Sequence, residues 1–421
     1  MYSLQIIDYF FLFSLVSIWV VLLFNIFLTL SGYRFFTKIS NHSINVIEDM
    51  ESFPFVSIMV PAHNEEKVIG RTVKSLLSLN YPRDRMELIV INDNSSDNTG
   101  LVLEGIKREF PQSNFKIINT TKENGGKGKS NALNIGFQNS AGEYIAVYDA
   151  DNTPDRLALR YLVHRLSGDC GLGAVIGKFR TRNKKKNMLT RFINIETLSF
   201  QWMAQAGRWQ LFRLCTIPGT NFIVRRSIIE NLGGWDIHAI AEDTEISFRI
   251  YKLGYRIAFM PLAVTYEQEP ETIRVWMKQR TRWAKGNVYV LLKYFRKMLS
   301  GGTGPVTFDL LYFSSIYFVF LSSVIISDGI FLLGLFTDIR VGVSGNFLLL
   351  WLLAYLLFVL EVSIALTMEK GEANARNVAL VFLMYFTYCQ LWMVVAIHGI
   401  VLYIQDVLLK KETKWYKTER F

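Results

Sequence analysis

The chain has 421 residues, 51% of them hydrophobic, and a formal net charge of +10. This length suits about two or three domains, and the apolar content excludes disordered, collagen-like and low-complexity proteins. The cysteines are too few and too scattered for a disulfide scaffold, and no Cys/His cluster has the spacing of zinc ligands. A mean hydropathy of +0.22 with 19% charged residues indicates membrane segments joined to a soluble domain. The basic excess favours an acidic partner: anionic lipid, a phosphorylated substrate or nucleic acid.

Residues 10–30 form an uncharged, apolar run near the N-terminus. A bilayer core of ~30 Å needs roughly 20 such residues, so the run can cross a membrane. A cleaved signal peptide is the alternative, but the run is long for one, no basic residue precedes it and no small-residue cleavage site follows it. Asp8 is the only charge before the run, whereas Arg34 and Lys38 follow it. The positive-inside rule therefore places the next domain in the cytoplasm.

Three more apolar runs lie near the C-terminus, at Leu310–Phe336, Phe347–Met368 and Val378–Gln405. Asp328 and Glu361 are their only charged residues. None of the three shows the alternation of apolar and polar faces, with a period of 3.6 residues, that marks a surface helix of a soluble protein. We therefore expect all three to be membrane helices.

The side of the membrane on which the C-terminus lies stays open. Three passes after a cytoplasmic domain would place the basic tail of residues 410–421 outside, against the positive-inside rule. One apolar stretch can lie on the membrane surface instead, and the serine-containing residues 308–325 are our candidate for it.

The sequence between the membrane runs, residues 55–298, alternates strand and helix patterns, which predicts an α/β fold with a mostly parallel sheet. The expected strands are 56–60, 87–91, 115–118 and 144–148, and the expected helices are 68–79, 101–110 and 131–137. Ligands of open α/β sheets bind outside the carboxyl ends of the strands, so polar residues there should converge on one cleft. These residues are His63, Asn64, Glu65, Asp93, Asp149 and Asp151.

Asp149-Ala-Asp151 directly follows an apolar strand. Mg²⁺ prefers oxygen ligands and often takes only one or two carboxylates together with phosphate oxygens of a substrate. The two acids can therefore flank a divalent cation, although a solvated turn is the alternative. Asp93 also follows a strand, in a segment rich in residues that favour helix N-caps. Ser96 or Asp97 can supply the cap while Asp93 faces a ligand.

Residues 124–130 form a glycine-rich turn with Lys127 and Lys129 at the start of a helix, an arrangement that suits phosphate. The turn lacks the glycine spacing of a Walker A loop, and a plain lysine-rich loop is the alternative. Asp243, in residues 241–245, precedes a helical run at 246–253. It is either a helix N-terminal acid favoured by the macrodipole or a carboxylate base near a substrate.

Gln279-Arg-Thr-Arg-Trp283 lies in a basic, aromatic, amphipathic segment at 273–295. An interfacial helix is one interpretation. In the other interpretation, Arg280 and Arg282 neutralise a pyrophosphate, and Trp283 stacks on a sugar ring. A second basic cluster comprises Lys178, Arg180, Arg182, Lys184, Lys185, Lys186 and Arg191. We expect it to face solvent or the membrane, or to contact an accessory protein.

The ordered set of motifs resembles glycosyltransferase family 2, and more narrowly its membrane-embedded processive synthases of poly-N-acetylglucosamine, chitin oligosaccharides, hyaluronan and cellulose. The motifs lie at residues 61–66, Asp93, 128–134, 149–151, 241–243 and 279–283. The resemblance is close from about 55 to 295 and covers the membrane parts only in outline.

The resemblance implies a GT-A-like nucleotide-sugar domain and a role for each motif. Its nucleotide-sugar residues would be His63 and Glu65 at the uracil, Asp93 at the uridine, Lys129 near the diphosphate and Asp149 at the nucleotide. Asp151 would bind Mg²⁺ or Mn²⁺, and Asp243 would be the general base. The diphosphate and the acceptor sugar would be bound by Gln279, Arg280, Arg282 and Trp283.

Three positions depart from the family pattern. Ala241 replaces a usual threonine, His63 replaces a usual tyrosine, and residues 217–222 carry an unusual pair after Gly219. Because the last segment helps to line the acceptor site in the family, the acceptor can be atypical.

We expect five regions: an anchor at 1–35, the transferase domain at 50–270, an amphipathic segment at 271–300, a membrane region at 305–409 and a basic tail at 410–421. The resemblance favours a multi-pass cell-membrane enzyme with a cytoplasmic catalytic domain. This enzyme would polymerise a hexose or N-acetylhexosamine from a UDP-sugar into a β-linked exopolysaccharide and translocate the product. Regulatory or export subunits are possible partners, and nucleic acid is not expected. Alternatives are a non-processive transferase with a polyprenyl or other lipid acceptor, and a transporter with a nucleotide-sensing domain.

Overall fold

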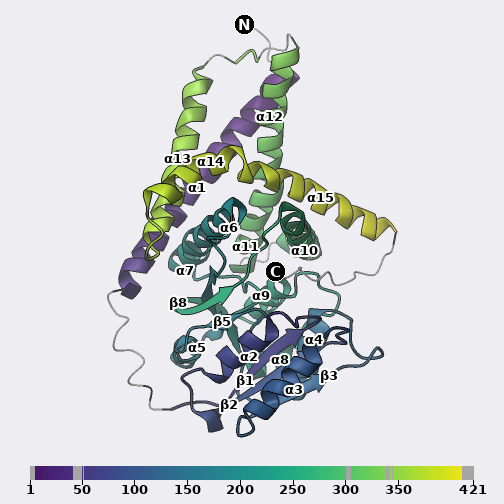
Figure 1. Cartoon of the computed structure of the whole chain (residues 1–421). Helices are drawn as coiled ribbons and strands as arrows, with labels where there is room; N and C mark the ends of the chain where they lie inside the picture. The colour runs from purple at the N-terminus through teal and green to yellow at the C-terminus, as the bar shows by residue number, and fades with distance from the viewer. Residues whose placement is uncertain are drawn as a thin grey trace.

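The computed structural model describes residues 5–40, 50, 52–299, 305–337, 341–343 and 345–409, and the expected basic tail at 410–421 lies outside them. An eight-stranded sheet with its helices forms the lower part of the molecule in Figure 1, and long apolar helices form the upper part. The strands are β1 (Val56–Ala62), β2 (Met86–Asn92), β3 (Phe115–Asn119), β4 (Tyr144–Val147), β5 (Thr153–Pro154), β6 (Leu172–Thr181), β7 (Phe222–Arg225) and β8 (Arg256–Glu267).

The helices of the lower and middle parts are α2 (Ile69–Leu77), η1 (Arg83–Arg85), α3 (Thr99–Glu109), α4 (Lys129–Gln138), α5 (Ala158–Ser167), α6 (Met188–Ser199), η2 (Phe200–Ala206), α7 (Gly207–Phe212), α8 (Arg226–Leu232), α9 (Glu242–Lys252) and α10 (Ile273–Leu299). The remaining helices are α1 (Ile6–Ser40), α11 (Pro305–Ser314), η3 (Ser315–Phe320), α12 (Leu321–Phe336), α13 (Phe347–Thr367), α14 (Ala375–Phe386) and α15 (Tyr388–Leu408).

The sheet has the strand order β3-β2-β1-β4-β7-β6-β8-β5. Strands β1 to β4 are parallel, β7 runs antiparallel to both of its neighbours, and β8 is parallel to β6. Every residue of β1 and β2 is buried, because helices cover both faces of a parallel sheet and the strands then read as continuous apolar runs. The predicted mostly parallel α/β fold is confirmed, with the four predicted strands in place. The sequence analysis identified no strand after residue 148 and so missed the other half of the sheet.

Helix α1 joins the upper part to the sheet domain through two glycines. A Cβ on Gly32 would lie 2.0 Å from the carbonyl oxygen of Trp202, and one on Gly207 would lie 2.4 Å from that of Leu28. Because neither position has room for a side chain, the backbones of α1 and of the η2–α7 segment are in direct contact. The first apolar helix and the sheet domain therefore pack as one unit at this crossing.

Within the described residues, four helices are long and apolar enough to cross a membrane: Ile6–Ser40, Leu310–Phe336, Phe347–Thr367 and Tyr388–Leu408. Figure 1 shows α1, α12 and α13 rising side by side, whereas α15 runs sideways over the middle of the molecule. The predicted run at 378–405 is not one helix, because it breaks at Thr387 between α14 and α15. Residues 308–325, the candidate surface stretch, belong instead to the upright segment α11–η3–α12.

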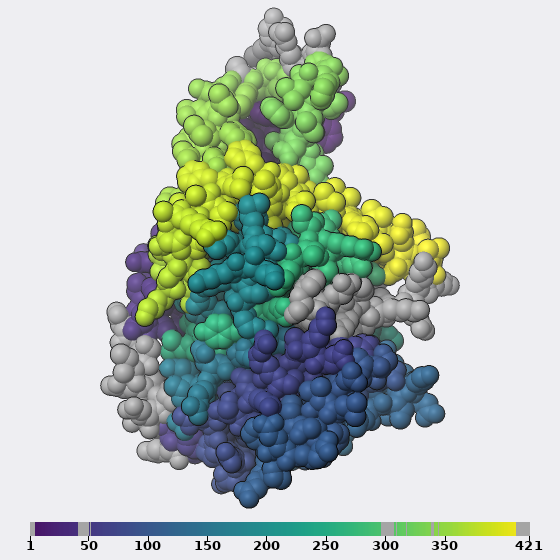
Figure 2. All heavy atoms as spheres, in the orientation of Figure 1, coloured from purple at the N-terminus to yellow at the C-terminus, as the bar shows by residue number. Residues whose placement is uncertain are grey.

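Helix α15 rests on α10. A Cβ on Gly399 would lie 2.8 Å from the Cβ of Ala284, so the two helices approach as closely as small residues permit. Lys285 of α10 also forms an ion pair with Asp406 near the end of α15. Figure 2 shows the atoms of α15 lying over those of the middle part, so this helix covers the sheet domain on the side of the apolar helices.

Three members of the second basic cluster do not face solvent or lipid, and this prediction was wrong. Lys178 and Arg180 of β6 pair with Glu369, at 2.6 Å and 2.7 Å, and Lys184 pairs with Glu372. Both acids lie in the turn between α13 and α14. This turn is part of the expected membrane region at 305–409. Removing one partner of a buried ion pair costs about 3–5 kcal/mol. These pairs therefore attach the apolar C-terminal region firmly to the sheet.

Candidate active site

A cavity of about 1030 Å³ lies between the carboxyl edge of the sheet and helices α10 and α15. Its wall includes Asp149 and Asp151 after β4, residues 216–220 before β7, residues 239–244 at the start of α9 and residues 277–283 of α10. Most of the predicted site residues line it: Glu65, Lys129, Asp149, Asp151, Asp243, Gln279, Arg280, Arg282 and Trp283. Of the six strand-end residues expected to converge on one cleft, Glu65, Asp149 and Asp151 line this cavity, and His63, Asn64 and Asp93 do not.

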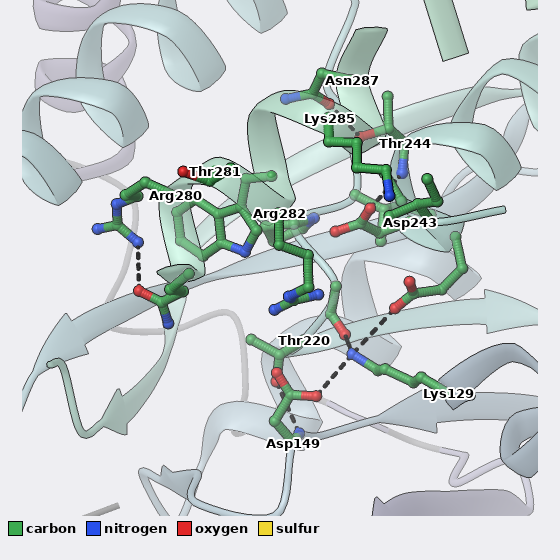
Figure 3. A pocket seen from close by; sticks show the side chains of 18 of the residues that line it. Lys129, Asp149, Thr220, Asp243, Thr244, Arg280, Thr281, Arg282, Lys285 and Asn287 are labelled. Atoms are coloured by element: carbon green, nitrogen blue, oxygen red, sulfur yellow. Dashed lines mark hydrogen bonds and ion pairs between the residues drawn. The ribbon is translucent and has the colours of Figure 1, made fainter. Parts of the chain in front are cut away.

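Lys129 stands at the centre of the acidic part of the cavity. Its Nζ lies 2.7 Å from Oδ1 of Asp149 and 3.3 Å from Oε1 of Glu242, and it donates to the carbonyl of Gly219 at 2.8 Å. Burial disfavours its charge, but attraction by Asp149 and Glu242 outweighs burial and raises the pKa of Lys129. The ammonium group therefore stays charged, and Figure 3 shows its contact with Asp149.

Asp243 is in the first turn of α9, where the helix N-terminus favours a negative charge. Its Oδ1 accepts a hydrogen bond from the backbone N–H of Thr244 at 2.7 Å. Burial and the neighbouring Glu242 nevertheless raise the pKa of Asp243 to about 7, against the opposing effects of Lys129 and Arg282. A carboxyl group with a pKa near the working pH is suited to accept and release protons.

His63 and Asp93 do not line the cavity; they lie together beside it. The ring Nδ1 of His63 is 2.6 Å from the carbonyl oxygen of Asp93. Oδ1 of Asp93 accepts from the hydroxyl of Thr120 and the N–H of Gly126, at 2.9 Å and 2.8 Å. Oδ2 of this fully buried residue has no hydrogen-bond partner among the described residues.

Asp151 is buried at the cavity wall, and its Oδ2 accepts from the backbone N–H of Gln268 at 3.2 Å. Among the described residues no group of three or more His, Cys, Asp or Glu side chains could hold a metal. The protein alone therefore forms no metal cage there. One carboxylate fits a cation that takes its other ligands from a substrate and from water.

The two arginines of residues 279–283 point to different places (Figure 3). Arg282 extends toward Lys129 and Asp149. Arg280 points away from them, and its Nη2 lies 3.0 Å from Oε2 of Glu196. Burial opposes its charge, but Glu196 and Glu269 outweigh burial and raise the pKa of Arg280. Arg282 is therefore the arginine that a diphosphate beside Lys129 could meet.

The sequence was then compared with known proteins. The profile described as "Glycosyltransferase like family 2" matches residues 54–286, more than half of the chain. The chain belongs to glycosyltransferase family 2. A "Probable glycosyltransferase YdaM" of Bacillus subtilis is 51% identical over 411 residues, which are 98% of this chain and 97% of that protein.

A second relative of this family-2 glycosyltransferase is the poly-beta-1,6-N-acetyl-D-glucosamine synthase of Staphylococcus aureus, 34% identical over 267 residues. The match spans 63% of each protein. Among solved structures, a mannosyltransferase from Pyrobaculum calidifontis, in complex with GDP-Man and Mn²⁺, superposes with a TM-score of 0.58 at 20% identity. It covers 93% of this chain and 99% of that one, which confirms the GT-A-like fold with flanking apolar helices.

Several residues of the family-2 cavity were missed by the sequence analysis. They are Glu196, Thr197 and Phe200 from α6 and η2, Phe313 from α11, and Trp392, His398 and Leu402 from α15. They lie in apolar runs without a motif, so no local pattern distinguishes them from residues of a hydrophobic core. Glu196, the one charged residue between Arg191 and Arg208, is the signal that could have pointed to this part of the site.

Proposed function

We propose that this glycosyltransferase moves a hexose or N-acetylhexosamine from a UDP-sugar to a growing saccharide, inverts the anomeric centre and so builds a β-linked polymer at the cell membrane. The observation that carries the proposal is the placement of Asp243 beside Lys129 and in one cavity with Trp283. A base, a cation for the leaving group and an aromatic platform for a sugar are thereby brought together. The resemblance to a poly-N-acetylglucosamine synthase supports a polymer product.

The donor would occupy the side of the cavity next to the sheet. The family resemblance assigns His63, Glu65 and Asp93 to the uracil base; Glu65 lines the cavity, and His63 and Asp93 are in contact with each other outside its wall. Asp149 lies at the mouth of this region and Lys129 and Arg282 face the diphosphate. Two cations offset the negative charge that grows on the leaving UDP as the glycosidic bond breaks, and such prearranged charges are a large source of catalysis.

A divalent ion, Mg²⁺ or Mn²⁺, fits Asp151 under the same proposal. Its other ligands would be diphosphate oxygens and water, because the described part of the protein supplies no further cluster of ligands. When bound, the ion would supply further charge stabilisation to the leaving group. The mannosyltransferase of similar fold was solved in complex with Mn²⁺, which supports this assignment.

The acceptor hydroxyl must lose its proton as it attacks the anomeric carbon, and Asp243 would take it. Because burial and Glu242 raise its pKa to about 7, the carboxylate holds a proton more strongly than an exposed aspartate does. A single attack from the face opposite UDP inverts the anomeric centre, so an α-linked donor gives a β-linked product. Trp283, with 39% of its surface exposed, is free to stack on the acceptor sugar.

One observation favours the second candidate, a transferase that acts on a lipid-linked acceptor. The far end of the cavity is lined by Phe313, Trp392 and Leu402 of α11 and α15. Apart from Phe313, near the start of the candidate span Leu310–Phe336, no described residue of α1, η3, α12 or α13 lines it. An acceptor that leaves the cavity by this end would meet the membrane surface rather than a path between the spans, as an apolar lipid anchor requires.

We also propose a topology in which α1, α12 and α13 cross the membrane while α15 lies on its cytoplasmic face above α10. Apolar side chains of α15, among them Val394, Ile397 and Val401, are exposed and can contact lipid. Three spans place the catalytic domain and the basic residues 410–421 on the same side, which satisfies the positive-inside rule. This arrangement removes the conflict that three C-terminal crossings created.

The experiment that tests the proposed function incubates purified protein in lipid nanodiscs with a panel of radiolabelled UDP-sugars. UDP release and the products would be measured together. Polymer retained on the protein supports the processive synthase, whereas a single sugar on extracted lipid supports the second candidate. A membrane fraction with candidate export or regulatory subunits provides a second sample. Absence of UDP release from every donor in both samples would contradict the proposal.

A further inference from the structure

Arg280 occupies a buried position in α10. Only 1% of it is exposed, and its Nη2 lies 3.0 Å from Oε2 of Glu196 and 3.9 Å from Oε2 of Glu269. Its Nη1 donates to Oε1 of Gln279 at 2.9 Å. With three oxygen partners, this guanidinium is held in one orientation and cannot turn toward the donor without breaking buried contacts.

Glu196 has a second partner on a different helix. The hydroxyl of Tyr388, the first residue of α15, donates to the same Oε2 at 2.5 Å. Nε1 of the wholly buried Trp276 donates in turn to this hydroxyl at 2.9 Å. One carboxylate on α6 therefore joins α10, which carries residues 279–283, to the bend at which α15 begins.

The face of the Arg280 guanidinium lies against Trp283. Its Cζ is 3.9 Å from the centroid of the Trp283 ring, well within the range of a cation–π contact. A planar guanidinium held parallel or tilted to a ring restricts the orientations that the ring can adopt. Trp283 also lines the cavity, with 39% of its surface exposed. The position of the exposed ring therefore depends on Arg280, and the position of Arg280 depends on Glu196.

We propose that Glu196 is a positioning residue for the acceptor: it holds Arg280 against Trp283 and ties this platform to helix α15. The proposal rests on the proposed function in one respect, namely that Trp283 stacks on the acceptor sugar. A change in the position of α15 on the membrane would thereby reach the acceptor site through Tyr388 and Glu196. Glu196 takes no part in donor binding, because its partners lie on the side of α10 away from Lys129.

The test is the Glu196→Gln variant, which keeps the side-chain shape but removes the charge that holds Arg280. With UDP-N-acetylglucosamine as donor and a β-1,6-linked N-acetylglucosamine oligosaccharide as acceptor, transfer and donor hydrolysis would be measured in the same sample. Their ratio does not depend on the fraction of folded protein. Because a displacement of about 1 Å can cost about 10²-fold in rate, we expect the ratio to fall tenfold or more and the acceptor KM to rise. UDP affinity and hydrolysis should stay within about twofold.

Two further variants separate positioning from a general structural role. Tyr388→Phe removes a buried hydrogen bond from the same carboxylate but leaves the pair with Arg280, so the ratio should stay close to that of the wild type. Arg280→Lys keeps the charge but loses the flat contact with Trp283, so it should lower the ratio as Glu196→Gln does. Equal loss of transfer and hydrolysis in Glu196→Gln, or an unchanged ratio, would overturn the proposal.

A Trp283→Ala background distinguishes failure of the inference from failure of the proposed function. If Glu196 acts through Trp283, Glu196→Gln should have no further effect on the ratio once the ring is removed. If Trp283→Ala itself leaves the ratio unchanged, the acceptor role of Trp283 is wrong and the proposed function must be revised. A second readout needs no substrate. The tryptophan fluorescence that is lost in Trp283→Phe comes from Trp283, and acrylamide quenching of this component measures how accessible the ring is. That component should become more accessible in Glu196→Gln.

Discussion

The carboxylate of Asp243 lies against the backbone of Gly219. A Cβ on Gly219 would be 2.8 Å from Oδ2 of Asp243, and the φ angle of this glycine is +87°. The residue therefore has to be glycine for two reasons, because L side chains rarely adopt this conformation and because none would fit. The same glycine accepts from Lys129 through its carbonyl, so its backbone contacts both Asp243 and Lys129.

Gly219→Ala should reduce turnover by about 10²-fold, because the new methyl group must displace Asp243. Gly233→Ala is the matched control: its φ angle is +71°, but no atom lies within 4 Å of the added Cβ. Both variants should lose about 1–2 kcal/mol of stability from backbone strain, and only the first should lose activity. Turnover and thermal melting of the two proteins check this, and equal activity in both would show that Gly219 acts only through its backbone angle.

Asp243→Asn should reduce turnover by about 10²–10⁴-fold, the usual effect of removing a general base. UDP affinity should hardly change, since Asp93, Asp149 and Lys129 remain. The asparagine oxygen can still accept from the N–H of Thr244, so the start of α9 should remain folded. Calorimetric titration with UDP and a turnover assay give the two values. Turnover within a few-fold of wild type would mean that Asp243 is only a helix N-terminal residue.

The pH profile of turnover should rise up to about pH 7 and then level off. Asp243 must be ionised to accept a proton, and its pKa is raised to about 7 by burial and by Glu242. Below this pH the carboxyl group is protonated and the rate should fall about tenfold per pH unit. The profile of kcat/KM measured from pH 5 to 9 tests the assignment. A flat profile between pH 5 and 8 would contradict it.

Asp151→Asn and excess chelator should each abolish transfer, if Asp151 holds the divalent ion beside the diphosphate. Asp155→Asn is a suitable control, because Asp155 follows the same turn but does not line the cavity. It should retain activity. Restoring Mg²⁺ or Mn²⁺ after chelation should recover the wild type but not Asp151→Asn. Full turnover of the wild type in excess chelator would refute the metal assignment.

Labelling of single cysteines in sealed cells tests the proposed topology. The N–H of Gly342 donates to Oδ1 of Asp8 at 2.6 Å, so the start of α1 and the connection from α12 to α13 lie together. Val343→Cys should therefore react with an impermeant maleimide from outside. The native Cys170, exposed on the catalytic domain, and a cysteine added after Phe421 should react only after permeabilisation. Labelling of the added C-terminal cysteine in intact cells would show that α15 crosses the membrane.

Local sequence was sufficient for the first half of the sheet and for the acids at its edge. Strands β1 and β2 are buried on both faces, so they appear as unbroken apolar runs, and a polar turn such as Asp149-Ala-Asp151 marks the end of such a run. The order of motifs was likewise enough to identify the family. Later strands such as β7 escaped notice because a short strand inside a polar region has no distinctive period.

Contacts between distant segments could be known only from the folded chain. Residues 280 and 282 are roughly 200° apart on a helix, so their side chains must point to different faces, yet the sequence does not say which face meets the donor. Packing against α6 pairs Arg280 with Glu196, whereas Arg282 extends toward Lys129 and Asp149. Lys178 meets Glu369 across 191 positions. Such pairings depend on how whole elements pack, and no local pattern of residues encodes them.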